Sequence, residues 1–144
     1  LYQINHRTTD TVTVSDDMAA LLSKGLEYCE KSGGAFDITI EPLSSLWNFT
    51  SGEAVIPDAA DIEADIPKVD YHNLVLSGNT LTFLSPDTTI DLGSIAKGYI
   101  ADRIKDQLLD AGVKSAIINR SLRRRKAGWE QVPHRTSETV CGPR

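Results

Sequence analysis

The sequence lacks the features that would indicate several common classes of protein. No apolar run reaches the roughly 18 residues that a membrane-spanning helix needs. The chain has two cysteines, Cys29 and Cys141, which are far apart and give neither a zinc nor a redox motif. Signatures of serine hydrolases, zinc proteases and P-loop nucleotide-binding proteins are absent. The chain opens with LYQINHR, without a signal-peptide pattern or an initiating Met, so we expect it to start partway into a longer protein, with any export signal upstream.

Histidine is also scarce. The three histidines, His6, His72 and His134, have no spacing typical of a catalytic triad or a metal site. We therefore expect each of them to be a surface residue.

Charge is distributed unevenly along the chain. Residues 1–119 contain eight basic and eighteen acidic side chains, whereas residues 120–144 contain seven basic and two acidic ones. An acidic body repels phosphate, which argues against nucleic acid as a partner. The basic tail has two interpretations: a functional patch on nucleic acid or anionic lipid, or a segment that does not belong to the domain.

Periodicity predicts an α+β fold with a mixed sheet and packed helices. One helix is expected after Ser15, which can cap it, with Met18, Leu21, Leu22, Gly25 and Cys29 along one stripe. A second long helix is expected over 94–112 and a short one over 58–66. Alternation predicts strands at 35–40, 88–93 and 115–118 and a hairpin around Gly78-Asn79. The last strand–helix–strand unit is compatible with a parallel crossover.

The first candidate site is IDLGSIAKGYIAD, where a predicted strand meets a predicted helix. Gly93 allows a tight turn, Ser94 is expected to cap the helix, and Lys97 lies in its first turn. Free amides, the positive helix end and an ammonium group suit a phosphate, while Asp91 suits a ribose hydroxyl or a metal. Spacing alone favours the ordinary alternative, a capped helix with a solvated lysine.

The second candidate site is GGAFDITIEPLSSLWNF. Its small residues let a ligand approach the backbone, Phe36 and Trp47 suit the faces of a planar ring, and Asp37 offers a carboxylate to a ring edge or hydroxyl. Taken alone, this segment favours a strand with a core Phe and a Trp packed over it.

Together the two segments, in this order, resemble the ApbE family, the FAD:protein FMN transferases formerly described as thiamine-biosynthesis lipoproteins. The resemblance runs from about Leu1 to Asn119 and includes the acidic segment PDAADIEADIPKVDYHNLVL. It implies an enzyme that uses FAD and Mg²⁺ to transfer FMN to a Thr or Ser hydroxyl of a partner flavoprotein in a respiratory or electron-transfer complex, with release of AMP. Family members are exported and lipid-anchored to the membrane.

The resemblance also implies roles for individual residues. Ala35, Phe36, Asp37 and Asp91 match FAD contacts, and Lys97 matches a basic residue beside the cofactor phosphates. The backbone carbonyl of Ser94 matches a Mg²⁺ ligand.

Departures from the family pattern predict an incomplete domain. The upstream lipobox, further FAD contacts, the downstream Mg²⁺ ligands and a histidine-bearing segment have no match here. We therefore expect a partial flavin transferase domain over 1–119, inactive alone, and a poorly ordered non-family tail over 120–144. The rival function is a non-catalytic flavin-nucleotide binder.

The sequence makes a testable prediction about the tail, which we expect to be a frameshift product. One allowed choice of codons for WEQVPHRTSETVCGPR, read one base later, gives GSKFRIGLQKPFADR, which resembles the family segment downstream of AIIN. Sequencing the coding DNA tests this directly. Stop codons or unrelated residues in the shifted frame would show that the hypothesis is wrong and that the basic tail needs a functional explanation.

Overall fold

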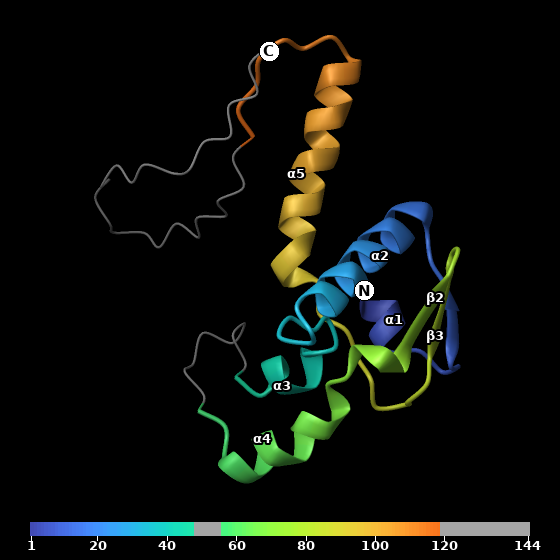
Figure 1. The fold of residues 1–144 in the computed structure, drawn as a ribbon, viewed down its shortest axis with the longest axis vertical. Coiled ribbons are helices and arrows are strands. Elements are labelled where there is room, and N and C mark those ends of the chain that lie inside the picture. Colours follow the sequence, from blue (N-terminus) through green and yellow to red (C-terminus); the bar gives the residue numbers. More distant parts are fainter. Residues whose placement is uncertain (48–55, 119–144) are drawn as a thin grey trace, which may run out of the picture. The chain divides into compact units, whose positions relative to one another are not determined.

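The computed structural model describes residues 1–47 and 56–118, which divide after Ile95 into two compact units. Helices and a small antiparallel sheet make up the described residues, which confirms the α+β class (Figure 1). Phe49, His134, Cys141 and the predicted tail over 120–144 lie outside the described residues.

The longest helix of the first unit is α2 (Asp16–Lys31), as predicted. The Ser15 hydroxyl accepts a hydrogen bond from the Met18 N–H at 3.3 Å, and two acidic residues occupy the positive first turn. The chain leaves the helix through Gly33 and Gly34, whose φ angles of 62° and 81° favour glycine. The buried stripe differs in one detail from the prediction, because Ala19 is buried and Met18 is only half-buried.

The sheet has three antiparallel strands in the order β1 (Thr11–Thr13), β3 (Thr80–Phe83), β2 (Leu74–Ser77). Strands β2 and β3 form the predicted hairpin, which turns at Gly78 with a φ of 56°. Leu81, in the central strand, pairs with Val12 on one side and Leu76 on the other and is fully buried.

The core of the first unit joins this sheet to α2 and to two irregular segments. Leu22, Ile38, Leu81 and Ile90 are all fully buried. Gly25 makes this packing possible, since a Cβ added there would lie 3.0 Å from a methyl group of Ile38. The helix and the irregular segments therefore approach each other more closely than a larger residue would allow.

Three predicted strands are wrong for the described residues. Segments 35–40 and 88–92 are irregular, Gly93 begins α5, and segment 115–118 contains only one bridge residue, Ile117. Burial alternates along 88–92, whereas in 35–40 Ile38 and Thr39 are both buried and Ile40 is exposed. The described residues accordingly contain no parallel crossover.

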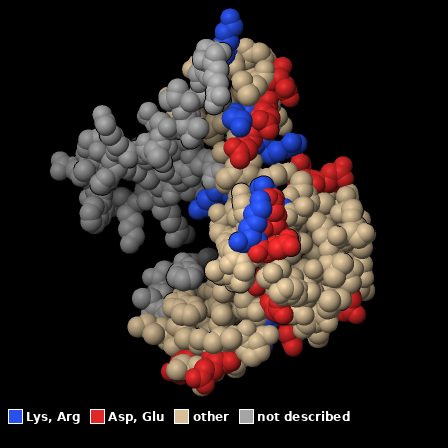
Figure 2. Space-filling model, in the orientation of Figure 1, with Lys and Arg blue, Asp and Glu red and all other residues tan. Residues whose placement is uncertain are grey.

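Short helical segments connect the main elements. These are α1 (Tyr2–Asn5), α3 (Glu41–Ser45), α4 (Ala59–Asp65), η1 (Ile66–Lys68) and η2 (Tyr71–Asn73). The helix expected over 58–66 is thus confirmed, and Pro42 lies at the start of α3, where its missing N–H costs nothing. The acidic residues of α4 form a red patch at the lower end of the face shown in Figure 2.

The second predicted long helix is also confirmed, as α5 (Gly93–Asp110). It begins in the first unit and continues into the second, and Gly112, with a φ of 78°, follows its end. No residue of α5 is buried, and of the apolar stripe expected there, formed by Ile100, Ile104 and Leu108, the first two are exposed, Ile100 at 52% and Ile104 at 38%. Within the described part of the chain, no helix combines the length and apolar character needed to cross a membrane.

Candidate functional site

The fold brings together the two segments that the sequence singled out within the first unit. The Asp91 N–H donates a hydrogen bond to the Ile38 carbonyl oxygen at 2.7 Å. Segment 35–39 and segment 90–93, about fifty residues apart in sequence, therefore lie side by side next to α2. Asp37 and Asp91, which were predicted from separate motifs, belong to neighbouring stretches of backbone.

The Asp37 carboxylate has three internal hydrogen-bond donors. One oxygen accepts from both the N–H and the hydroxyl of Thr39 at 2.7 Å, and the other accepts from the Tyr71 N–H at 3.0 Å. Thr39 is fully buried, so its hydroxyl needs this partner. Asp37 thus shapes its own turn and attaches it to η2, a role that the sequence pattern did not reveal.

Asp91 takes the capping position that the sequence assigned to Ser94. Its Oδ1 atom accepts from the Gly93 N–H at 2.7 Å, at the first residue of α5. Ser94 is the second residue of the helix and is exposed. Glycine suits position 93, because an added Cβ would lie 3.0 Å from that carboxylate oxygen.

The remaining predicted contacts lie at the surface of their own segments. Ala35 is exposed, and Phe36 is half-buried with its ring edge-on to Tyr28, 6.3 Å between centroids. Lys97 is exposed on α5, in the second unit. Trp47 is half-buried at the end of the described stretch 1–47.

Side chains from the N-terminus hold the irregular chain that precedes Asp91. The Arg7 guanidinium donates to the carbonyl oxygens of Thr88, Ser85 and Pro86 at 2.8, 3.1 and 3.1 Å, and it lies 3.4 Å from the centre of the Phe83 ring. Partial burial lowers the pKa of Arg7, although nearby Asp10 opposes this effect, and the group stays charged at neutral pH.

Asn5 makes two hydrogen bonds to the backbone of one residue. Its amide nitrogen donates to the Ile90 carbonyl oxygen, and its amide oxygen accepts from the Ile90 N–H, both at 2.9 Å. The Thr89 hydroxyl donates to the Glu41 carboxylate at 2.5 Å. Side chains therefore supply hydrogen bonds to the backbone of residues 85–90 that a neighbouring strand would supply in a sheet.

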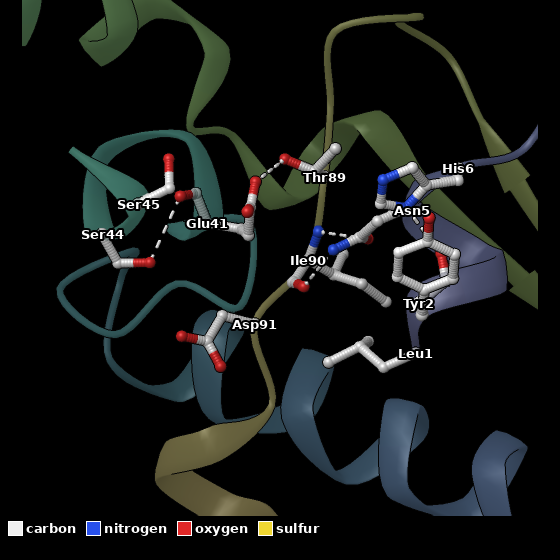
Figure 3. Close-up of a pocket in the computed structure, with 10 residues that line it drawn as sticks. All are labelled: Leu1, Tyr2, Asn5, His6, Glu41, Ser44, Ser45, Thr89, Ile90 and Asp91. Atoms are coloured by element: carbon white, nitrogen blue, oxygen red, sulfur yellow. Dashed lines mark hydrogen bonds between the residues drawn. The ribbon is translucent and has the colours of Figure 1, made fainter. Parts of the chain in front are cut away.

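Asn5, Glu41, Thr89 and Ile90 belong to the wall of a cavity of about 650 Å³ in the first unit (Figure 3). It is lined by Leu1, Tyr2, Asn5, His6, Glu41, Ser44, Ser45, Thr89, Ile90 and Asp91. This volume falls in the range typical of small-molecule sites. Asp91 is the one residue of the cavity wall that the predicted contacts included.

No motif pointed to the other cavity residues. His6 is exposed, as expected, but it also lines the cavity and stacks on Tyr2 with ring centroids 3.9 Å apart. Glu41 and the two serines of α3 lie within the second candidate segment, but no role was predicted for them. The signal they carried was proximity in sequence to the AFD motif, which is too weak to identify a cavity.

The cavity suits a neutral, hydroxyl-bearing ligand better than an anion. Glu41 and Asp91 place two carboxylates in its wall, beside hydroxyl groups and the Asn5 amide. One oxygen of the Asp91 carboxylate is free to accept a hydrogen bond, since the described residues engage only Oδ1. Phosphates would be repelled here unless a cation accompanied them.

The described residues do not form a metal site on their own. No group of three or more His, Cys, Asp or Glu side chains lies close enough in them to hold an ion. Ser94, expected to offer its carbonyl oxygen to Mg²⁺, lies within the first turn of α5. A Mg²⁺ ion at this position would need ligands from outside the described residues.

Comparison with known proteins identifies a family. The model of the ApbE family matches residues 1–131, which extends past Asn119, where the motif resemblance was expected to end. An FAD:protein FMN transferase of Klebsiella pneumoniae is 38% identical over 119 residues, covering 81% of this chain and 38% of the relative. The corresponding protein of Treponema pallidum is 30% identical over 115 residues, covering 75% of this chain and 32% of the relative.

Solved structures give the same result. The flavin transferase ApbE from Vibrio cholerae matches with a TM-score of 0.74 and 28% identity, over 81% of this chain and 39% of that chain. The apo form of the Pseudomonas stutzeri flavinyl transferase ApbE matches with a TM-score of 0.70 and 30% identity, over 80% and 37% respectively. This chain therefore spans less than half the length of the relatives it matches.

The contacts of Asp37 predict a structural cost for its removal. Asp37→Ala deletes the acceptor of three hydrogen bonds and leaves the buried Thr39 hydroxyl unpaired. We expect the free energy of unfolding to fall by about 1.5–3 kcal/mol, measured by urea denaturation without ligand. The matched control is Asp87→Ala, since Asp87 is exposed and accepts no hydrogen bond from the described residues; its effect should stay within about 0.5 kcal/mol. Equal midpoints for the two variants would contradict this role of Asp37.

Proposed function

Because this chain belongs to the ApbE family, we propose that it forms the first part of an FAD:protein FMN transferase. Its motif resemblance to that family is confirmed by the family model and by relatives of that name. The proposed reaction moves FMN from FAD to a Thr or Ser hydroxyl of a partner flavoprotein and releases AMP.

The observation that carries the proposal is the junction of the two motifs beside a cavity. The Ile38–Asp91 hydrogen bond joins the segment that contains Ala35, Phe36 and Asp37 to the segment that contains Asp91. Asp91 also lines the 650 Å³ cavity. A ligand that contacts both motifs is thus compatible with the geometry of one unit.

The chemistry of FAD fits the donors and acceptors present. Its ribityl and ribose chains carry hydroxyl groups, which suit carboxylate acceptors such as Asp91 and Glu41. Its pyrophosphate is anionic and needs positive charge, for which we propose Lys97 on the basis of the family motif. Ala35 leaves room for close approach of a ligand to the backbone.

Mg²⁺ belongs to the same proposal. A divalent cation neutralises charge on a pyrophosphate while its bond is broken. We propose that the backbone carbonyl of Ser94 contributes one ligand, with the others supplied from outside the described residues. Since the described residues do not complete this set of ligands, we expect the chain alone to be inactive in transfer.

The partner and the location are proposed from the family alone. The acceptor would be a flavoprotein of a respiratory or electron-transfer complex, and nucleic acid is not expected as a partner. The full-length protein would be exported and lipid-anchored, through an upstream segment. The rival proposal is a flavin-nucleotide binder without transferase activity, which the incomplete metal site favours.

A transfer assay tests the proposed function. The 144-residue chain and a chimaera are each incubated with FAD, Mg²⁺ and an acceptor that carries the target threonine; in the chimaera, residues 1–118 replace the matching segment of the Klebsiella pneumoniae relative. We expect covalent flavin on the acceptor, seen by in-gel fluorescence, with the chimaera and little or none with the chain alone. Labelling by the chain at the rate of the intact relative would contradict its inactivity. A folded chimaera that binds FAD but does not label would favour the binder.

A second experiment tests Lys97. In the active chimaera, Lys97→Ala should weaken FAD binding tenfold to a hundredfold, because a charge-assisted hydrogen bond contributes about 1.5–3 kcal/mol. Flavin fluorescence titration measures the affinity. Lys105→Ala is the matched control, since Lys105 lies on the same helix near Asp102 and Asp106 and should leave the affinity unchanged. Equal affinities for the two variants would show that the phosphate contact has been assigned to the wrong residue.

A further inference from the structure

One side chain outside both motifs, that of Asn5, is hydrogen-bonded to the backbone of the residue before Asp91. Asn5 lies 85 positions before Ile90 in the sequence, yet it makes two hydrogen bonds to the backbone of that residue. We propose that Asn5 is a positioning residue of the flavin site, which acts by fixing the orientation of the peptide units around Asp91. The inference rests on the proposed function, because Asp91 is taken as a flavin contact.

The geometry at Ile90 leaves little freedom. Both backbone polar groups of Ile90 are bonded by Asn5 at 2.9 Å, and the Ile90 side chain is fully buried (Figure 3). A primary amide can donate and accept at the same time, as the backbone of a neighbouring strand does. Asn5 therefore fixes Ile90 as a ladder partner would, in chain that has no ladder.

The hydrogen bonds of Asn5 to Ile90 also restrict the next residue, Asp91. The Asp91 N–H is bonded to the Ile38 carbonyl oxygen at 2.7 Å, and one carboxylate oxygen is bonded to the Gly93 N–H. The carbonyl group of Ile90, which Asn5 holds, belongs to the same peptide unit as the Asp91 N–H. Loss of the Asn5 amide would let this peptide unit rotate, and the free carboxylate oxygen of Asp91 would no longer have a fixed direction.

The location of Asn5 separates this role from general support of the fold. Asn5 itself lines the cavity next to Asp91. Arg7 already secures residues 85–88, and the buried contacts of Leu22, Ile38 and Leu81 lie on the other elements of the core. Removal of Asn5 should therefore disturb the cavity wall more than it disturbs the unit as a whole.

The test is a double-mutant cycle in the chimaera that carries residues 1–118, with FAD affinity measured by flavin fluorescence. We expect Asn5→Ala to weaken binding about as much as Asp91→Ala, by tenfold or more, and the double variant to be no weaker than Asp91→Ala alone. Non-additivity is expected because the two residues act as one unit. Asn5→Asp is the second variant: it can accept from the Ile90 N–H but cannot donate to the carbonyl oxygen, so its loss should be intermediate.

Amide hydrogen exchange, measured without flavin, gives an independent readout. Asn5→Ala should speed exchange at Ile90 and Asp91 at least tenfold and leave Leu81, in the central strand, unchanged. The control is Asn79→Ala: the Asn79 amide also bridges distant segments, by donating to Asp16, but it lies outside the cavity. Asn79→Ala should change neither the affinity nor exchange at Ile90.

The outcomes separate the two claims. A folded chimaera with the wild-type residues 1–118 that does not bind FAD would overturn the proposed function and this inference with it. Binding by that chimaera that Asn5→Ala leaves unchanged, or strictly additive losses, would overturn this inference alone. Faster exchange throughout the chain in Asn5→Ala, Leu81 included, would also overturn it, since it would assign Asn5 a general structural role.

Discussion

The hydrogen bond between the Asp91 N–H and the Ile38 carbonyl oxygen is the contact on which the candidate site depends. It joins two irregular segments, each of which places one isoleucine in the core beside α2. Burying irregular backbone costs free energy unless its N–H and C=O groups are hydrogen-bonded, so neighbouring residues have to supply the partners. Asp37, Asn5 and Arg7 meet this requirement with side chains. These hydrogen bonds hold the side of the cavity formed by residues 89–91, which belongs to no regular element.

Local signals predicted α2, α4, α5 and the β2–β3 hairpin, whereas α1, β1 and α3 were not predicted. The predicted elements depend on contacts between residues close in sequence. In α2 they are the cap, the apolar stripe and the terminal glycines, and in the hairpin the turn between β2 and β3, so the local sequence is enough to predict them. Strands at 35–40 and 88–93 were predicted wrongly because apolar residues alternate in both sequences although neither segment joins the sheet; in 35–40, Thr39 is even buried and Ile40 exposed. Alternation of residue types carries no information on whether the backbone has a ladder partner.

The candidate site was predictable only in its motifs. Asp37 and Asp91 were found because they lie in segments whose order resembles a family, and that resemblance is what the comparisons confirm. Their internal partners could not be found, since the Tyr71 N–H lies 34 positions from Asp37. The same holds for the wall formed by Glu41 and Thr89, 48 positions apart. Contacts of this length follow from the tertiary fold and leave no periodic trace in the sequence.

The long reach of Asn5 and Arg7 also bears on how the unit folds. Helix α2 and the hairpin can form from contacts close in sequence, whereas the Asn5–Ile90 and Arg7–Thr88 bonds close loops of 85 and 81 positions. Ordering such loops costs chain entropy that is recovered only when the final contacts form. The cavity should thus be organised last, and during synthesis only after Ile90 has left the ribosome. Until then Asn5 and Arg7 lack their hydrogen-bond partners, although α2 can already have formed.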